Sequence, residues 1–489
     1  MKKPVVAVLV ALILLAAVVL ARALRLRSRQ PQVAPVAAEP LDSTALAEHL
    51  AAALRFRTVS YQDSSQFDAR EFDGLHRYLR ETYPRLHAAL SLEQVNGYGL
   101  LYRWAGSDSS LASILLLAHQ DVVPVEPGTE DRWSEPPFGG RVSGGYVWGR
   151  GALDDKGSLV AVFEAVEHLV AAGAQPRRTV YFASGYDEEA GGARGARQIA
   201  ALLASRHVRP AFVLDEGGAL VTGIVPGVAA PVALVGIAEK GYVTVELTAH
   251  AAGGHSSVPP PPGASAVGML SAAIVRLERH QLPRAIRGPT AAMLDYLAPE
   301  LSFGPRLALA NRWLCSGLVA RRFGASPEGN ALVRTTTAPT VVQAGVKENV
   351  LPSTARALVN FRILPGDSVE GVVEHVRRVV ADSRISVQAL PTSRSNPSPV
   401  ASPDSQGFQL LARTIRQVVP GTVVTPWLVV GGTDSRYYAS LTPNVYRFVG
   451  IAIDRDDLKR IHGIDERVGV GAFATAVRVY LQLLRNAAL

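Results

Sequence analysis

The sequence predicts an α/β protein in which a mixed, mostly parallel sheet flanked by helices is interrupted by a smaller α+β domain. Short apolar runs alternate with helical spacing through residues 111–218, which is typical of a mostly parallel sheet with helices on both faces. Between residues 241 and 392 the expected order becomes strand–helix–strand–strand–helix–strand, a ferredoxin-like arrangement. A Pro- and Ser-rich stretch at 391–405 then suits a hinge back to the first domain.

An apolar segment precedes the predicted domains. Pro4 to Ala21 is an unbroken apolar run between two basic clusters, at the short limit for a membrane-spanning helix. Arginines directly after the run favour an uncleaved anchor within residues 1–29, and a cleaved signal sequence is the alternative. Basic residues on both sides leave the orientation open. We expect a catalytic domain outside the cytoplasm that is membrane-anchored, or secreted if the segment is cleaved. Residues 30–40, rich in Pro, Ala and Val, are typical of a linker.

The charge and cysteine content exclude several classes of protein. The formal net charge is +8, and no acidic residue precedes residue 39. Six of the basic residues lie in the first 29 positions: Lys2, Lys3, Arg22, Arg25, Arg27 and Arg29. The remaining chain has no basic patch that indicates nucleic-acid binding. The single cysteine, Cys315, excludes an intramolecular disulfide and a cysteine-based zinc site.

Polar residues follow three of the predicted strands. The apolar run from Ile114 ends in His119, and Asp121 is positioned to orient its imidazole. Strands at 179–184 and 211–214 are followed by the pair Glu188-Glu189 and by Asp215. Because ligands bind outside the carboxyl ends of strands in such sheets, we expect these side chains to converge.

Two further segments complete a candidate metal site. A Gly-flanked turn carries Asp154 and Asp155 before a predicted helix at 158–172; helix capping is the alternative role for these aspartates. His462 follows the strand-like segment 445–453 and is the best second histidine. Imidazole and carboxylate ligands without a thiolate suit Zn²⁺, with Co²⁺ or Mn²⁺ as substitutes. One carboxylate could bridge two metal ions. If one residue of the pair Glu188-Glu189 binds metal, the other is free to act as a general base.

Seven motifs in the chain resemble those of a known family. They are His119-Gln120-Asp121, Gly149-Arg150-Gly151 with Asp154-Asp155-Lys156-Gly157, Asp187-Glu188-Glu189, Asp215-Glu216-Gly217-Gly218, Gly254-His255-Ser256-Ser257, Asn360-Phe361-Arg362 and Gly431-Gly432-Thr433-Asp434-Ser435-Arg436. Together they resemble the zinc peptidases that include aminoacylase, carboxypeptidase G and succinyl-diaminopimelate desuccinylase. Within that family the sequence is most similar to the branch of carboxypeptidase S and the N-fatty-acyl-amino-acid hydrolases.

The resemblance implies a role for each motif residue. Glu188 would be the general base and acid, Asp154 would bridge two zinc ions, and Asp121 would support His119. The implied ligands are His119, Asp154, Glu189, Asp215 and His462. The resemblance also implies a catalytic domain in two parts, 41–240 and 393–489, interrupted by a lid and dimerisation domain at 241–392.

Residues of the lid are expected to reach the substrate. The resemblance implies that His255 stabilises the oxyanion, commonly in the partner subunit of a homodimer, although its segment also reads as an ordinary hairpin turn. Arg362 suits capture of a substrate carboxylate, with a surface salt bridge as the alternative. Asn349 and Gly432 are expected to add substrate contacts. The insertion at 283–331 would form an acyl-chain wall, a membrane or dimer surface, or simple lid packing.

The predicted function is a two-zinc hydrolase that cleaves an amide bond beside a free C-terminal carboxylate. Carboxypeptidase action on short peptides of the Gly-Xaa type is the first candidate, and hydrolysis of N-acyl amino acids is the second. A non-catalytic binding scaffold is disfavoured because Glu188 and all five expected ligands are present.

Overall fold

A mixed ten-stranded sheet forms the centre of the computed structural model, which describes residues 2–489. Four neighbouring strands in its middle run parallel: β6 (Val180–Ser184), β3 (Ile114–Leu117), β7 (Phe212–Asp215) and β17 (Val445–Arg447). Strands on either side add parallel and antiparallel pairs: β1 (Ser91–Val95), β2 (Gly99–Trp104), β8 (Leu220–Val221), β9 (Val232–Glu239), β16 (Val423–Val429) and β18 (Ala452–Ile453). The predicted mixed sheet is confirmed.

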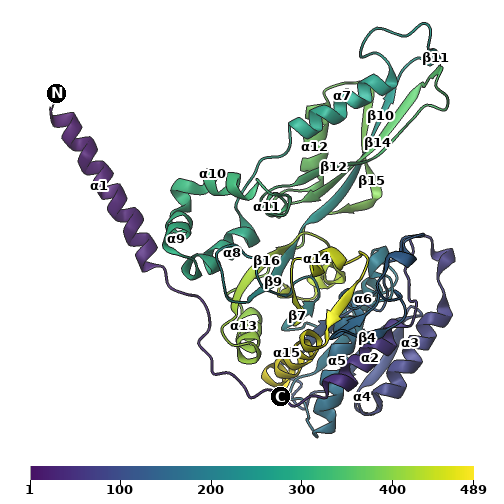
Figure 1. The fold of residues 1–489 in the computed structure, drawn as a ribbon, viewed down its shortest axis with the longest axis vertical. Helices are drawn as coiled ribbons and strands as arrows, with labels where there is room; N and C mark the ends of the chain where they lie inside the picture. Colours follow the sequence, from purple (N-terminus) through teal and green to yellow (C-terminus); the bar gives the residue numbers. More distant parts are fainter. Residues whose placement is uncertain (1) are drawn as a thin grey trace.

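Helices cover both faces of this sheet (Figure 1). Ile114 and Leu116 of β3 pack into one hydrophobic core, and Leu115 and Leu117 pack into another. The first core contains α2 (Ser43–Leu54), α5 (Lys156–Ala171), α13 (Gln406–Val418) and α15 (Val470–Ala488). The second contains α6 (Ala196–Ser205) and part of the 3₁₀ segment η5 (Asp434–Ser440). Burial on both faces explains why β3 is an uninterrupted apolar run.

Local sequence features set the ends of the first helices of the catalytic domain. The Asp42 carboxylate caps α2 by accepting hydrogen bonds from the backbone N–H groups of Thr44 and Ala45. An aspartate at this position satisfies amide groups that the helix leaves free. The next segment forms two helices, α3 (Ala69–Thr82) and α4 (Pro84–Ala89), because Pro84 starts a new helix and cannot continue the preceding one.

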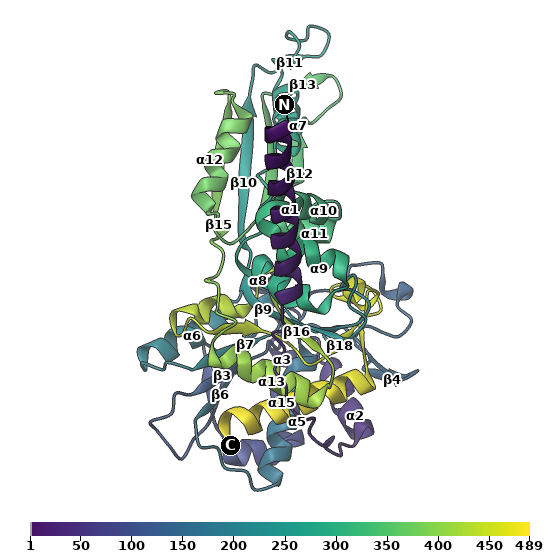
Figure 2. The ribbon, with the colours of Figure 1, turned by 90° about the vertical axis from the view of Figure 1, so that its left-hand side faces the viewer.

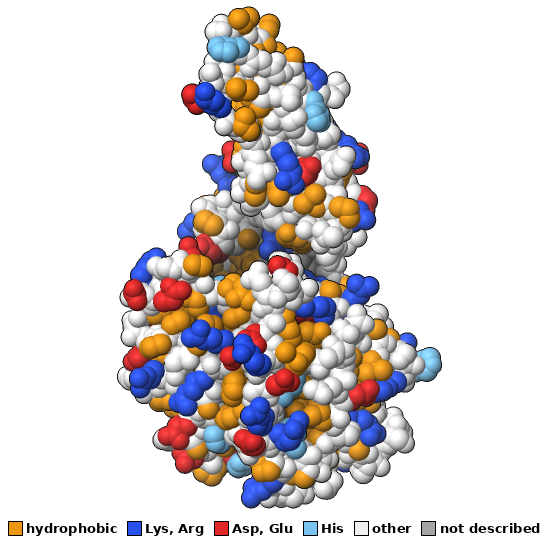
Figure 3. Space-filling model, turned by 90° about the vertical axis from the view of Figure 1, so that its right-hand side faces the viewer, with side chains coloured by type: hydrophobic (Ala, Val, Ile, Leu, Met, Phe, Trp, Pro, Cys, Tyr) orange, Lys and Arg blue, Asp and Glu red, His pale blue; other side chains and the backbone are white. Residues whose placement is uncertain are grey.

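The interrupting domain has the predicted ferredoxin-like order. Its elements are β10 (Gly241–His250), α7 (Ala266–Arg279), β12 (Thr336–Ala344), β14 (Thr354–Ile363), α12 (Val369–Val380) and β15 (Ile385–Ser395). The four strands form an antiparallel sheet in the order β12-β14-β10-β15. β15 runs to Ser395, so the first part of the predicted hinge is a strand. The molecule narrows between this lid domain and the catalytic domain (Figure 3).

The insertion at 283–331 packs on the catalytic sheet. It contains α8 (Gly288–Leu297), α9 (Phe303–Ala310), α10 (Arg312–Phe323) and the start of α11 (Pro327–Val333). Met293 and Leu294 of α8 share a hydrophobic core with Leu234 of β9 and Leu428 of β16. The insertion therefore extends the catalytic half, although the sequence grouped it with the lid. The domain boundaries themselves stay predictions.

The N-terminal helix α1 (Lys2–Arg25) extends away from the rest of the molecule (Figures 1 and 2). Its segment Lys3–Arg25 has a mean hydropathy of 3.1 and is long and apolar enough to span a bilayer. A signal sequence has the same properties.

Candidate metal centre and catalytic site

Three adjacent parallel strands deliver the central side chains of the site. His119 follows β3, Glu188 and Glu189 form the 3₁₀ turn η3 (Glu188–Ala190) after β6, and Glu216 follows β7. β3 pairs with both β6 and β7, so the three strand ends share one edge of the sheet. The strand ends that precede His119, Glu188-Glu189 and Asp215 thus meet where open α/β sheets bind their ligands.

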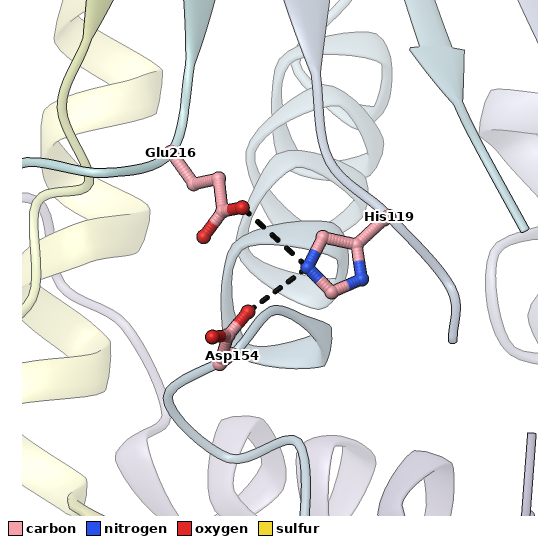
Figure 4. A group of neighbouring side chains, drawn as sticks. All are labelled: His119, Asp154 and Glu216. Atoms are coloured by element: carbon pink, nitrogen blue, oxygen red, sulfur yellow. Dashed lines mark hydrogen bonds and ion pairs between the residues drawn. The ribbon is translucent and has the colours of Figure 1, made fainter. Parts of the chain in front are cut away.

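His119 is the centre of a first group of possible metal ligands. Its Nε2 atom lies 2.9 Å from Asp154 Oδ1 and 3.6 Å from Glu216 Oε1. Figure 4 shows both carboxylates directed at this ring nitrogen. The His119 side chain is only 2% exposed, so its orientation is fixed by packing.

His462 is the centre of a second group, which shares Asp154 with the first. Its Nε2 atom lies 3.1 Å from Asp154 Oδ2 and 3.1 Å from Glu189 Oε1. The possible ligand atoms within each group all lie within 4.8 Å of one another. Asp154 presents one oxygen to each group, which is the arrangement of a carboxylate that bridges two ions.

Asp215, which the sequence suggested as a ligand, belongs to neither group. Its Oδ2 atom accepts a hydrogen bond from the backbone N–H of Ser435 at 2.7 Å. The next residue, Glu216, reaches His119 instead. Successive residues at the end of a strand point in opposite directions, so only one of this acidic pair faces the histidine.

Asp121 contacts both His119 and the backbone of the η3 turn. Its Oδ1 atom lies 3.4 Å from His119 Nδ1, and His119 Nδ1 also lies 2.9 Å from the backbone oxygen of Asp121. The same carboxylate accepts hydrogen bonds from the backbone N–H groups of Glu188 and Glu189, at 3.2 and 3.1 Å. Asp121 thus fixes the histidine ring and the glutamate turn together.

The sequence reasoning did not identify Glu466, which anchors the turn that carries Asp154. Its buried Oε1 atom accepts hydrogen bonds from the backbone N–H groups of Gly151, Leu153 and Asp154, and its Oε2 atom lies 2.5 Å from Arg150 Nη1. Glu466 is four positions after His462, so one short segment supplies a ligand candidate and fixes its partner. Asp155, in contrast, makes no side-chain cap for α5.

Electrostatics make the site suitable for cations. Burial raises the pKa of Glu188 and Glu189, and raises that of Glu216 to about 8. Hydrogen bonds to Asp154 and Glu189 raise the pKa of His462 to about 10. Carboxylates crowded into a desolvated space need positive charge between them, and divalent cations supply it. The nitrogen and oxygen donors fit zinc and similar ions.

Two arginines, Arg362 and Arg436, lie near one another, and Arg436 also lies near Glu188. Arg362 is the penultimate residue of β14. Its Cζ atom lies 4.9 Å from the centroid of the Tyr242 ring on the neighbouring strand β10. Burial and the nearby charge of Arg436 lower the pKa of Arg362, and Glu188 contributes to the raised pKa of Arg436. A Cβ atom on Gly432 would lie 3.0 Å from Arg436 Nη1, so a side chain there would crowd this group.

His255 and Asn349 lie together, at the far tip of the lid (Figure 1). His255 belongs to β11 (Gly254–His255), which pairs with β13 (Val350–Leu351). The backbone oxygen of Asn349 accepts a hydrogen bond from Ser256 N–H. His255 is exposed and its Nδ1 atom lies 2.7 Å from Ser257 Oγ. Within residues 2–489 of one chain, this pair and the two ligand groups are not brought together.

Comparison with known proteins agrees with this geometry. Residues 115–486 match Peptidase family M20/M25/M40. The chain belongs to this family. It is therefore a metal-dependent peptidase or amidohydrolase, and the family includes the Bacillus subtilis YXEP protein, a dinuclear metal-binding peptidase whose fold is similar (TM-score 0.54, 14% identity, 90% of this chain and 98% of that one).

Two relatives of this M20 peptidase are similar over nearly its whole length. A probable carboxypeptidase S-like 2 of Dictyostelium discoideum is 40% identical over 95% of this chain and 90% of its own. The N-fatty-acyl-amino acid synthase/hydrolase PM20D1 of Xenopus tropicalis is 39% identical over 98% and 93%. The M20 metallo-carboxypeptidase Sso-CP2 of Sulfolobus solfataricus shares the fold, with a TM-score of 0.65 at 18% identity over 91% and 99%.

The Asp121 contacts in this M20 peptidase give a first prediction. Asp121→Asn replaces one acceptor oxygen with a donor beside two backbone N–H groups, so we expect metal affinity to fall about 10- to 100-fold. Chelator competition measures this affinity. Ser60→Ala is the matched control, because it removes only a hydroxyl that donates to Asp121 Oδ2 and leaves the carboxylate. Equal affinities of Asp121→Asn and the wild type would show that Asp121 does not support the metal site.

Proposed function

We propose that this M20 peptidase is a two-zinc hydrolase that cleaves an amide bond next to a free C-terminal carboxylate. The observation that carries the proposal is the pair of ligand groups joined through the two oxygens of Asp154. We assign the ligands as His119, Asp154, Glu189, Glu216 and His462, so Glu216 takes the place that the sequence suggested for Asp215.

The second glutamate of the pair is available for proton transfer. Glu188 belongs to neither ligand group, and its backbone is held by Asp121. Its raised pKa lets the carboxylate take a proton from the attacking water and return it to the leaving amide nitrogen. Two bound zinc ions would supply Lewis-acid polarisation and a more acidic water. Glu189 and its histidine partner hold their positions while Glu188 moves the proton.

The arginine group supports recognition of the substrate carboxylate. Arg362 belongs to the lid strand β14 and lies near Arg436 of η5, which in turn lies near Glu188. A guanidinium binds a carboxylate with two parallel hydrogen bonds. A free carboxylate held there would direct the neighbouring amide bond towards Glu188. Gly432 would leave room for the substrate beside Arg436.

Short peptides of the Gly-Xaa type are the first substrate candidate, supported by the carboxypeptidase S-like relative. N-fatty-acyl amino acids are the second, supported by the hydrolase relative, which is similar over 98% of this chain. Both substrates end in a free carboxylate, and they differ in the acyl group on the other side of the amide bond. Zinc-loaded enzyme should be assayed with Gly-Leu and N-oleoyl-leucine side by side. A higher kcat/KM for Gly-Leu supports the first candidate, a higher value for the lipid substrate replaces it with the second, and no turnover of either contradicts both.

The carboxylate site gives a second prediction. Arg362→Lys keeps the charge but loses the bidentate geometry, so we expect KM to rise about 10-fold or more with a smaller change in kcat. The loss should disappear for a substrate whose carboxylate is an amide. Arg356→Lys is the control, since Arg356 lies on the same strand but pairs with Glu246. An unchanged KM for Arg362→Lys would mean that Arg362 does not bind the carboxylate.

The lid tip gives a third prediction, which concerns a homodimer. We infer that His255 acts on the oxyanion in the partner subunit, because it is exposed and lies apart from its own catalytic site (Figure 1). His255→Ala and Glu188→Ala chains should each be inactive. Co-expressed, they should regain about a quarter of wild-type activity, since random pairing gives one complete site in half of the dimers. Absence of any recovery in isolated mixed dimers would contradict action between subunits.

For the location of the enzyme, we propose a single N-terminal anchor with the catalytic domain outside the cytoplasm. The length and hydropathy of α1 support the anchor. Protease protection in sealed vesicles tests the orientation, and retention of residues 1–25 in the mature chain separates an anchor from a cleaved signal sequence.

A further inference from the structure

The contact between α1 and the insertion links the apolar helix to the catalytic half. Most of α1 is exposed, but Ala23 near its end is fully buried. Asn311 Nδ2 donates to the Val19 oxygen at 3.0 Å, and Arg22 Nε donates to the Ala310 oxygen at 3.3 Å. Asn311 lies between α9 and α10. The α9–α10 corner therefore sits beside the C-terminal end of α1, where a spanning helix would leave the bilayer.

The segment after α1 is fastened to the catalytic domain. The buried Gln30 side chain donates to the Val424 oxygen and accepts from Val424 N–H, at 2.9 and 2.8 Å. Further along, Glu39 pairs with Arg485 and His168, at 2.8 and 2.9 Å. Residues 30–40 contain no helix or strand, as expected of a linker, yet these bonds hold them in place. The catalytic domain is thus held close to the end of α1.

The outer side of α9 and α10 exposes large apolar side chains. Phe303, Trp313, Leu314 and Leu318 are 51%, 56%, 54% and 68% exposed, and we call them the α9–α10 face. The opposite side of α10 is buried through Val319 and Ala320. Exposed apolar groups of this size on adjacent helices mark a contact surface.

The charges around this face indicate its partner. Residues 301–327 contain four arginines and no acidic residue, and Arg321 shares the exposed side of α10 with Leu314 and Leu318. Helices that lie in a membrane interface combine Trp and Leu with arginines that reach lipid phosphates. Arg312 is paired with Asp295 at 2.6 Å, whereas Arg321 and Arg322 are exposed. A second copy of the chain placed on the same face would bring these two arginines towards their counterparts, with no acidic residue of 301–327 to pair with them. An anionic bilayer surface fits both the apolar and the charged groups.

We propose that the α9–α10 face rests in the interfacial layer of the bilayer that α1 enters. The catalytic domain would then lie against the membrane through two contacts, the spanning helix and this face. The insertion would serve as a membrane-docking element, and this role is independent of the metal site.

Trp313 gives a direct test in the full-length enzyme. The chain should be reconstituted in phosphatidylcholine–phosphatidylglycerol vesicles whose acyl chains carry bromine at a shallow position, which quenches nearby tryptophan. We expect quenching of the wild type and its loss in Trp313→Phe. Of the other four tryptophans, Trp104, Trp133 and Trp148 are buried, and the half-buried Trp427 of β16 packs against the core beneath α8. Equal quenching of the two proteins, or none in either, would overturn the proposal.

Nitroxide labels provide a second measurement with a matched control. Cys315→Ser removes the only cysteine, and Leu318→Cys or Val142→Cys then introduces one label site. Val142 is 46% exposed on β4 (Arg141–Ser143), far from α10 (Figures 1 and 2). We expect the label at 318 to be reached by oxygen and protected from a water-soluble nickel complex, and the label at 142 to be reached by nickel. Equal nickel access at both sites contradicts docking, and spin–spin broadening at 318 would assign the face to a second copy instead.

Discussion

Glu188→Ala is expected to abolish measurable hydrolysis while the enzyme still binds about two zinc ions per chain. General acid–base catalysis contributes about 10²- to 10⁴-fold to such reactions, so kcat should fall by at least that range. The reason is that the two glutamates of the η3 turn have different roles, one as a proposed metal ligand and one as the proposed base. Glu189 Oε1 lies 3.1 Å from His462 Nε2 and belongs to one of the two ligand groups. Glu188 belongs to neither group. Zinc analysis and single-turnover kinetics on the same preparation measure both quantities.

Glu189→Ala is the matched comparison for Glu188→Ala. It changes the neighbouring residue of the same turn, and we expect it to lower zinc content as well as turnover. If Glu188→Ala also lost zinc, Glu188 would be a ligand and not the base. If Glu188→Ala retained wild-type kcat, the proton would have to be transferred by another group.

The sequence predicts the parts of the site that depend on strand order. His119 and the pair Glu188-Glu189 each follow an apolar strand, and parallel neighbours bring such ends to one edge without further information. His462 is brought in from the far end of the chain, and the sequence reached it by elimination and by resemblance. Glu466 was missed because a buried carboxylate that accepts three backbone N–H bonds has no pattern of its own in the sequence.

Packing details of the fold lay beyond the sequence patterns. The ferredoxin-like order could be read from alternating and helical spacing, and the lid strands follow it closely. The surface on which the insertion packs could not be predicted from such spacing. The apolar side chains of α8 would suit any hydrophobic surface, and only the position of β9 and β16 decides that they cover the catalytic sheet. Similarly, the apolar spacing within the insertion does not show where one helix ends. In the structure Asn311 follows the last residue of α9 and makes a contact with α1.

The acidic pair at the end of β7 provides the strongest test of the metal assignment. Glu216→Gln keeps the size of the side chain but replaces an anionic ligand with a neutral one 3.6 Å from His119 Nε2. We expect the affinity for one zinc ion to fall about 10- to 100-fold or more, with a comparable loss of kcat/KM at limiting zinc. Zinc titration against a chelator should then resolve one tight and one weak site.

Asp215→Asn is the matched control, since it is the same chemical change one residue earlier. The asparagine oxygen can still accept the hydrogen bond from Ser435 N–H, so the buried backbone group keeps a partner. Both zinc sites should remain tight, and the free energy of unfolding should change by less than about 2 kcal/mol. The two variants differ only in which carboxylate is neutralised. The variant that loses zinc affinity therefore identifies the carboxylate that binds zinc. Loss of zinc from Asp215→Asn but not from Glu216→Gln would restore the ligand that the sequence motif suggested and reject the one that the geometry selects.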